Sequence, residues 1–119
     1  MSDPNCLFCR IARGEIPASK IYDDAEVMAF HDIRPQAPVH FLIVPKAHVA
    51  TLYDAQAGHQ AALGKMLAIA GRLAREAGAT DGFRTIINNG RVGHQEVYHV
   101  HMHVLGGPEP LGPMLQRKR

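Results

Sequence analysis

The stretch YHVHMHVLGG, residues 98–107, alternates histidines with hydrophobic residues. Successive side chains of a β-strand point to opposite faces of the sheet, so this alternation predicts a strand. Its hydrophobic side, formed by Val100, Met102 and Val104, is expected to face the core. The opposite side then carries three histidines, turned together toward a cleft: His99, His101 and His103.

The sequence before this strand predicts the other elements of an α+β domain. HFLIVPK, residues 40–46, is almost continuously apolar and typical of a buried strand that ends near Pro45. Hydrophobic residues recur at steps of three and four over 54–77, which predicts one long helix that stops at Gly78. The remaining expected elements are a short helix over about 4–13, a hairpin over 21–22 and 26–30, and a strand over 83–89. Their order predicts an antiparallel sheet with helices packed on one face.

The composition is that of an ordinary globular protein. Of the 119 residues, 46% are hydrophobic and 20% are charged, and this length predicts a single domain over 1–119 with an irregular tail from about 108 to 119. The formal net charge of +2 is too small to indicate nucleic acid or a membrane as the main partner. The N-terminus lacks the pattern of a signal peptide, and no segment has the roughly 20 apolar residues of a membrane span, so we expect a cytoplasmic protein.

Two cysteines, Cys6 and Cys9, form a C-x-x-C motif near the N-terminus. In a reducing cytoplasm such a pair is rarely a structural disulfide. The spacing is compatible with a redox pair, with half of a zinc site, or with two unrelated buried thiols. A zinc site would need two further ligands from elsewhere in the chain.

The spacing of the three histidines argues against one metal ion shared by all of them. With a rise of about 3.3 Å per residue, the Cα atoms of His99 and His103 would lie roughly 13 Å apart, near the limit at which two imidazoles reach one ion. A neutral imidazole is a good nucleophile toward phosphorus and a good leaving group. We therefore expect His101 to attack a phosphorus atom while its neighbours orient it and stabilise charge. This chemistry requires an imidazole at position 101 that is exposed, uncharged and free of metal.

The form H-φ-H-φ-H-φ-φ of residues 99–105, with φ hydrophobic, resembles the signature of the histidine triad (HIT) superfamily. The stretches CLFCRIARGEIP, FHDIRPQAPVHFLIVPKAH and INNG followed by QEVYHVHMHVLGG also resemble the family, in the right order and over nearly the whole chain. The chain is most similar to the Hint branch, the purine nucleoside phosphoramidases, in their bacterial-type form with a C-x-x-C. The resemblance implies a five-stranded antiparallel sheet with one long and one short helix. It also implies a homodimer, paired through the long helix and a strand into a continuous ten-stranded sheet.

The resemblance implies hydrolysis of purine nucleoside 5′-phosphoramidates, such as adenosine 5′-monophosphoramidate, to the nucleoside monophosphate and an amine. His101 resembles the nucleophile that forms a nucleotidyl-histidine intermediate. His103 resembles the histidine that contacts the α-phosphate, and His40 a further histidine of the active site. Asn88 resembles the asparagine that helps to hold the phosphate. Asp32 resembles the carboxylate that holds the ribose hydroxyls, although beside the Arg34-Pro35 pair it could equally cap a turn.

The remaining nucleotide-binding positions are also implied by the resemblance. The nucleoside pocket corresponds to six residues from three segments: Leu7, Phe8, Ile11, Phe30, His31 and Ile33. Three residues that precede the triad complete the set: Gln95, Glu96 and Val97.

Superfamily members with a C-x-x-C bind zinc through the two cysteines, a histidine after the P-K-x-H strand end and the first triad histidine. The corresponding residues are Cys6, Cys9, His48 and His99, which implies a structural zinc site with no open position. Fixing His99 would anchor the segment that carries His101. The alternative is a metal-free protein in which both thiols lie in the core and His48 caps a loop.

Two positions depart from the family pattern. Many Hint proteins have serine where this chain has Glu96. A glutamate could act there as a general acid if its pKa were raised, but it also brings negative charge toward a phosphate. The tail lacks the W-P-P-G ending of eukaryotic members. Two other functions stay open: dinucleoside polyphosphate hydrolysis or nucleotidyl transfer through the same intermediate, and non-catalytic nucleotide binding by a regulatory protein.

Overall fold

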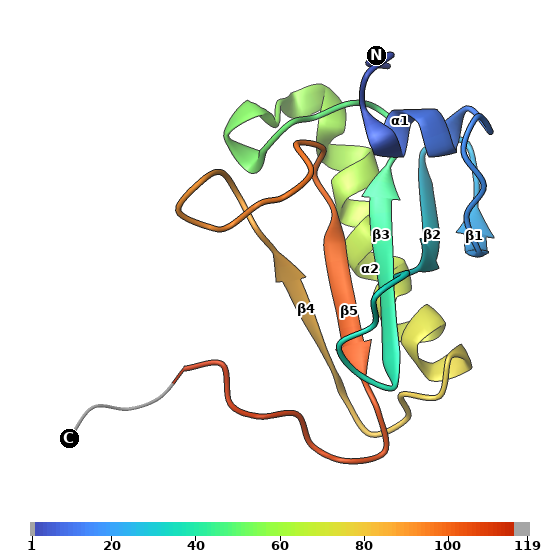
Figure 1. The fold of residues 1–119 in the computed structure, drawn as a ribbon, viewed down its shortest axis with the longest axis vertical. Coiled ribbons are helices and arrows are strands. Elements are labelled where there is room, and N and C mark those ends of the chain that lie inside the picture. The colour runs from blue at the N-terminus through green and yellow to red at the C-terminus, as the bar shows by residue number, and fades with distance from the viewer. Residues whose placement is uncertain (1, 116–119) are drawn as a thin grey trace.

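The computed structural model describes residues 2–115 and contains one five-stranded antiparallel sheet in the order β1-β2-β3-β5-β4 (Figure 1). Neighbouring strands pair antiparallel throughout. The strands are β1 (Lys20–Asp23), β2 (Val27–His31), β3 (Val39–Pro45), β4 (Phe83–Ile87) and β5 (Met102–Gly106). The helices are the short α1 (Leu7–Ala12) and the long α2 (Gln60–Glu76). The expected α+β class and the five-stranded sheet with one long and one short helix are therefore confirmed.

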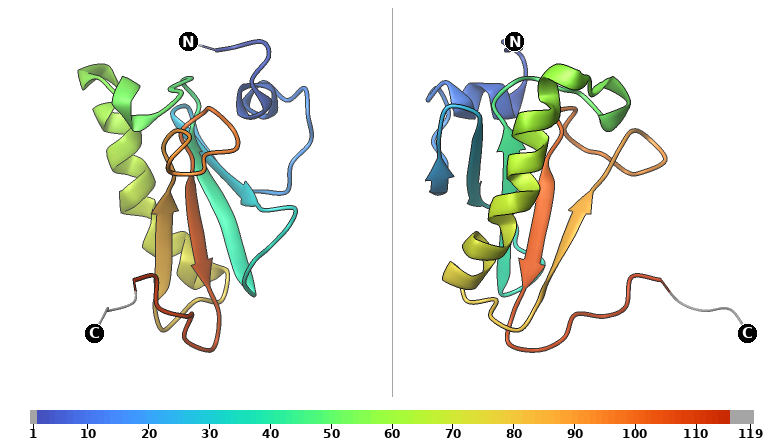
Figure 2. Two further views of the ribbon diagram at one scale, coloured as in Figure 1. Left: turned by 60° about the vertical axis from the view of Figure 1, so that its left-hand side comes forward. Right: turned by 180° about the vertical axis from the view of Figure 1, so that it is seen from behind.

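The central strand β3 is buried on both faces, because a helix covers each of them. Its residues Phe41 and Ile43 belong to the hydrophobic cluster beneath α2, whereas Leu42 and Val44 belong to the cluster beneath α1. Figure 2 shows α1 and α2 on opposite sides of the sheet. The expectation that the helices pack on one face is wrong. The run Phe41–Val44 of β3 is apolar at every position, and such a run needs cover on both faces of the sheet.

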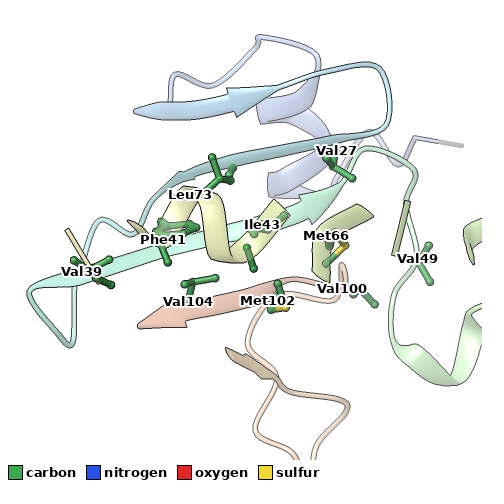
Figure 3. Packing of buried hydrophobic residues seen from close by; sticks show 14 residues of the cluster. Val27, Val39, Phe41, Ile43, Val49, Met66, Leu73, Val100, Met102 and Val104 are labelled. Carbon is green, nitrogen blue, oxygen red and sulfur yellow. The ribbon is translucent and has the colours of Figure 1, made fainter. Parts of the chain in front are cut away.

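The core beneath α2 confirms the predicted direction of the hydrophobic side chains that alternate with the histidines. Val100, Met102 and Val104 are fully buried and pack in this cluster (Figure 3). The cluster also receives the buried face of α2, whose residues recur at helical spacing: Met66, Ala70, Leu73 and Ala74. The intervening histidines are consequently directed to the other face of the sheet, the one that α1 covers.

Several element boundaries differ from the expected ones. The long helix begins at Gln60 rather than near 54, because two short 3₁₀ turns, Leu52–Asp54 and Ala57–His59, precede it. Strand β5 begins only at Met102, so His99 and His101 lie before the regular ladder. In that preceding segment the backbone N–H of Val100 donates to the carbonyl of Val49 in a loop, at 2.7 Å, instead of to a neighbouring strand.

The fourth strand also ends early, at Ile87 instead of 89. The side chain of Asn89 accepts a hydrogen bond from the backbone N–H of Leu52 at 2.7 Å, which ties this residue to a 3₁₀ turn. Residues 108–115 contain no helix or strand, and the rest of the expected tail, 116–119, lies outside the described residues. Within 2–115, neither helix is long and apolar enough to span a membrane.

Candidate functional site

Three imidazoles meet on the face of the sheet opposite α2. The rings of His101 and His103 have centroids 5.2 Å apart, and those of His40 and His103 are also 5.2 Å apart. Register explains the second contact: β3 and β5 are paired so that Leu42 faces His103, which puts His40 two residues along the neighbouring strand on the same face. The structure thus brings together the three histidines that the sequence selected for chemistry.

The His101 ring has one nitrogen fixed and the other free. Its Nδ1–H donates to the carbonyl oxygen of His99 at 2.8 Å, which leaves Nε2 of the neutral ring unprotonated. Nε2 has no hydrogen-bond partner within residues 2–115. Among those residues, every fully buried side-chain nitrogen or oxygen atom has a hydrogen-bond partner. Because Nε2 has none, it is not fully buried and remains accessible to solvent. A free lone pair is therefore held in a fixed direction.

The expectation that the His101 ring is exposed is wrong in one respect. Only 6% of the residue is exposed, because the Phe8 ring of α1 packs against the imidazole with centroids 5.1 Å apart. The ring is enclosed while its free Nε2 stays accessible.

A chain of hydrogen bonds sets the proton positions of His40 and His103. The backbone N–H of Gln36 donates to Nδ1 of His40 at 2.9 Å, so the proton of neutral His40 is on Nε2. That Nε2–H donates to Nδ1 of His103 at 2.9 Å. Neutral His103 consequently carries its own proton on Nε2, a donor without a partner in the described part of the chain. A free acceptor on His101 and a free donor on His103 thus lie on adjacent rings.

Burial, and to a smaller extent the neighbouring His101 and His40, lower the pKa of His103 from its usual 6.5 to about 4. The negative charges of Asp32 and Glu96 act in the opposite direction but are outweighed by burial. His103 is therefore uncharged at neutral pH and donates its hydrogen bond as a neutral imidazole.

Asp32 lies at the head of the loop between β2 and β3. Its Oδ1 accepts a hydrogen bond from the backbone N–H of Arg34 at 2.7 Å, so the turn-capping role that the sequence left open is present. Its Oδ2 lies 3.5 Å from Nε2 of His40. A cavity of about 180 Å³ opens beside this loop, lined by His31, Asp32, Pro35, Pro38, Val39, His40 and Ala77. The second carboxylate oxygen is thus available to a ligand next to the histidines.

The expected nucleoside residues divide into a buried and an exposed group. Phe8, Ile11 and Phe30 are buried in the cluster beneath α1, with the two phenyl rings 5.6 Å apart. Leu7 and Ile33 are exposed, at 42% and 92%, and His31 is exposed as well. Exposed apolar side chains next to a buried aromatic layer offer a surface on which a base could lie.

The residues just before the triad have different environments. Gln95 is buried, and its amide donates to the carbonyls of Ala50 and Val97 and accepts from the backbone N–H of Gly90. Its side chain therefore fixes the loop before the histidines. Glu96 is exposed, and Val97 is half-buried against the cluster beneath α1.

Asn88 directly follows β4. Ile87 is paired with Met102, so continuing the register by one residue places the half-buried Asn88 beside His101. Contact between a nucleotide and Asn88, or any of the residues 95–97, stays a prediction.

The donor atoms of Cys6, Cys9, His48 and His99 all lie within 4.8 Å of one another. Nδ1 of His99 is 3.2 Å from Sγ of Cys6 and 3.6 Å from Sγ of Cys9. Nδ1 of His48 is 3.5 Å from Sγ of Cys9. His99 Nε2–H donates to the carbonyl of Pro45 at 2.7 Å, so the Nδ1 lone pair of the neutral ring is the one that faces the thiols. This is the arrangement of a metal-binding cluster with its histidine oriented from behind.

A second group, Asp32, His40 and His103, also brings three potential metal ligands within 4.8 Å. Here the hydrogen bonds oppose metal binding. Because Nδ1 of His40 accepts from the N–H of Gln36, its Nε2 carries the proton and has no lone pair to offer an ion. The two groups therefore have different chemistry: the cysteine cluster presents lone pairs, and the second group shares protons.

Two backbone groups matter in ways that the sequence reasoning missed. The N–H of Gln36 sets the tautomer of His40, and the carbonyl of Pro45 sets that of His99. Side-chain patterns carry no signal for such contacts, because every residue has the same backbone groups. The sequence hinted at the Gln36 contact only through the loop between β2 and β3, which contains Pro35 and Pro38 and connects two strands that carry histidines.

The comparisons with known proteins agree with this geometry. The family described as HIT domain matches residues 13–109. The purine nucleoside phosphoramidase of Escherichia coli strain K12 is 51% identical over 113 residues, which cover 94% of this chain and 94% of that protein. Protein HitA of Neisseria gonorrhoeae is 49% identical over 104 residues, covering 87% of this chain and 97% of that protein.

Solved structures show the same similarity. The HIT family hydrolase from Legionella pneumophila Philadelphia 1 has a TM-score of 0.85 at 47% identity, covering 92% of this chain and 98% of that one. A histidine triad protein from Clostridium difficile has a TM-score of 0.87 at 40% identity, covering 95% and 99%. With the triad, its geometry and these relatives in agreement, the chain belongs to the HIT domain family.

Proposed function

We propose that this protein hydrolyses purine nucleoside 5′-phosphoramidates to a nucleoside monophosphate and an amine. The observation that carries the proposal is the free Nε2 lone pair of His101, fixed through Nδ1 and adjacent to the free Nε2–H of His103. The similarity to the phosphoramidase of Escherichia coli over almost the whole chain supports the substrate class.

In the first step, Nε2 of His101 attacks the α-phosphorus and forms a phosphorus–nitrogen bond while the bond from phosphorus to the leaving amine breaks. Nδ1–H keeps its hydrogen bond to the His99 carbonyl, which stabilises the positive charge that the ring gains. The Nε2–H of His103 donates to a phosphate oxygen, where negative charge develops. The product is an amine and a nucleotidyl-histidine.

The departing nitrogen takes up a proton as its bond to phosphorus breaks. We assign this proton to Glu96, whose carboxyl group is exposed and close enough to His103 to affect its pKa. In the second step a water molecule attacks phosphorus and gives a proton to the Glu96 carboxylate, the bond from phosphorus to His101 Nε2 breaks, and the nucleoside monophosphate leaves. His40 acts through its hydrogen bond to His103, which keeps the proton of His103 on Nε2.

The nucleoside would be held by the loop after β2 and by the exposed side of α1. Oδ2 of Asp32 is available to accept the ribose hydroxyls while Oδ1 keeps the turn in place. The exposed Leu7 and Ile33 would contact the base. Asn88, beside His101 by register, would hold the phosphate.

We propose further that Cys6, Cys9, His48 and His99 hold a structural zinc ion. With Zn–S near 2.3 Å and Zn–N near 2.0 Å, a tetrahedral site separates its sulfur and nitrogen ligands by about 3.6 Å. The sulfur–nitrogen separations in this cluster lie between 3.2 and 3.6 Å, so the residues fit the ion. Bound zinc would supply a cross-link between α1, the segment after β3 and His99, with all four positions filled by protein.

Thiolate ligands require reduced cysteines. Cys6 and Cys9 are free thiols in the structure. A location in a reducing compartment such as the cytoplasm, which keeps thiols reduced, is therefore part of this proposal.

We also propose that the single domain, residues 1–119, forms a homodimer through β4 and α2. Strand β4 is an edge of the sheet, and α2 lies over β2, β3 and β5, to one side of β4 (Figure 2). Unpaired strand edges require a partner or protection. Leu67 on α2 and Phe83 on β4 are exposed, at 62% and 42%, and a Cβ atom at Gly71, one helical turn after Leu67, would lie 3.9 Å from the Phe83 ring. Pairing of two β4 edges would give a continuous ten-stranded sheet.

Replacement of His101 tests the proposed reaction. We expect His101→Ala to lower the turnover of adenosine 5′-monophosphoramidate by at least about a thousandfold, because the attacking atom is lost. Binding of AMP, measured by calorimetry, should persist. An unmodified protein that binds AMP without turnover would instead indicate a nucleotide-binding regulator, and faster turnover of a dinucleoside polyphosphate would contradict the substrate class.

A further inference from the structure

Phe8 connects the cysteine cluster with the proposed nucleophile. It lies on α1 between Cys6 and Cys9, and 4% of it is exposed. Its ring contacts the imidazole of His99 at 5.7 Å and that of His101 at 5.1 Å between centroids, edge-on in both cases. A single buried ring therefore touches one member of the metal-binding cluster and the residue that bears the free lone pair.

This environment is unlike that of a residue that lines an open pocket. Phe8 has almost no free surface for a base, whereas Leu7 and Ile33 are well exposed. The neighbours of its ring are instead two imidazoles and Phe30, whose ring lies 5.6 Å away. Its position in the structure favours a role directed at the histidines rather than at the nucleoside.

The His101 ring needs more than one contact to be held in place. The hydrogen bond from Nδ1 to the His99 carbonyl fixes one corner of the ring, but the ring can still tilt about its bond to Cβ. The Phe8 ring, at 74° to the imidazole plane, blocks that tilt on one side. With both contacts in place, Nε2 keeps one direction.

We propose that Phe8 is a positioning residue for His101, and that α1 holds it there through the cysteine cluster. The inference rests on the proposed function, in which Nε2 of His101 attacks phosphorus. A helix of six residues has little stability of its own, so the position of Phe8 depends on what anchors α1. Cys6 and Cys9 supply that anchor at either side of Phe8, through His99 and His48. Occupancy of the metal cluster thereby affects the nucleophile without any direct contact with substrate.

The test is Phe8→Leu in the metal-loaded protein. Leucine keeps the site apolar but cannot make the edge contact, so we expect kcat for adenosine 5′-monophosphoramidate to fall about 10- to 100-fold, the effect of a slightly misplaced reacting group. The dissociation constant for AMP should stay close to that of the unmodified protein. A rise in KM and in the AMP dissociation constant with unchanged kcat would overturn the proposal and make Phe8 a wall of the nucleoside pocket.

Val44→Ala is the matched control, because Val44 is fully buried in the same cluster and lies on β3 instead of α1. It should reduce stability while leaving kcat close to normal. Equal losses of kcat in the two variants would contradict a specific role of Phe8.

Nitrogen-15 NMR of the imidazole rings gives a readout that does not depend on turnover. In Phe8→Leu, and in metal-stripped protein that stays folded by circular dichroism, the His101 ring signals should shift or broaden. Unchanged His101 signals in both samples would overturn the coupling even if the protein proved not to hydrolyse phosphoramidates. If the His101 signals shift but the protein does not hydrolyse phosphoramidates, the coupling between the cysteine cluster, Phe8 and His101 is supported. Only the proposed function is then rejected.

Discussion

Each triad histidine has a different free nitrogen because a different group occupies the other one. The Pro45 carbonyl takes the Nε2–H of His99, the His99 carbonyl takes the Nδ1–H of His101, and His40 donates to Nδ1 of His103. The first ring therefore presents Nδ1 to the thiols, the second presents an unprotonated Nε2, and the third presents an Nε2–H. Three identical side chains at alternate positions thus offer three different groups: a lone pair beside the thiols, a lone pair open to solvent and a hydrogen-bond donor.

The acid titration of His103 checks the environment of the donor. Because burial lowers its pKa to about 4, the folded protein binds fewer protons than the unfolded chain between pH 4 and 6.5. The His103 contribution to stability is therefore complete above pH 6.5 and is lost as the pH falls toward 4. We expect an NMR midpoint for this ring near 4, and a shallower fall of the free energy of unfolding over that range in His103→Gln. A midpoint near 6.5 would show that the ring is solvated.

At the scale of elements, periodicity predicted most of the fold. The alternation of residues 100–104 placed the hydrophobic set in the core correctly, and the apolar run of β3 identified the central strand. Periodicity did not predict which face of the sheet each helix covers. A run that is apolar at every position does not say which of its sides each helix covers.

The burial of His101 illustrates a second limit. The sequence indicated a histidine face directed to a cleft, but the Phe8 ring comes from a helix about 90 residues away along the chain and encloses the imidazole. Periodicity describes one segment, whereas enclosure depends on a second segment whose position follows from the tertiary fold. The same reason explains why the metal cluster needed the family resemblance: Cys6 and His99 meet only in the folded chain.

Helix α1 is the element whose stability should depend most on the metal. It has six residues, and the two cysteines beside and within it connect it to His99 and His48. We expect removal of zinc by a chelator to accelerate amide hydrogen exchange in residues 7–12, because a helix of this length opens when its anchor is lost. The buried amides of α2 provide the internal control and should exchange as before. Equal acceleration in both helices would indicate global unfolding, and none in α1 would contradict metal binding there.

At the scale of the whole molecule, the sheet has two unlike edges. At one edge, the turn between β1 and β2 is joined to α2 by ion pairs, in which the Lys65 ammonium lies 3.0 Å from Asp24 and 2.8 Å from Glu26. Strand β4, at the other edge, has α2 to one side of it (Figure 2). Within residues 2–115, β4 pairs with no strand on its outer side, so this edge and the exposed side of α2 are the surface that we propose for a second copy of the chain.

A charge placed on that surface tests the homodimer. Leu67 is 62% exposed on α2, and burial of an aspartate at this position against a partner would require desolvation of a carboxylate without a cation to pair with it. We expect the unmodified protein to sediment as a dimer at micromolar concentration and Leu67→Asp to sediment as a monomer with unchanged circular dichroism. Val92→Asp is the matched control, since Val92 is also an exposed apolar residue but lies in the loop after β4. It should remain dimeric. Dissociation by both variants would point to a general effect of charge, and a monomeric unmodified protein would refute the ten-stranded sheet.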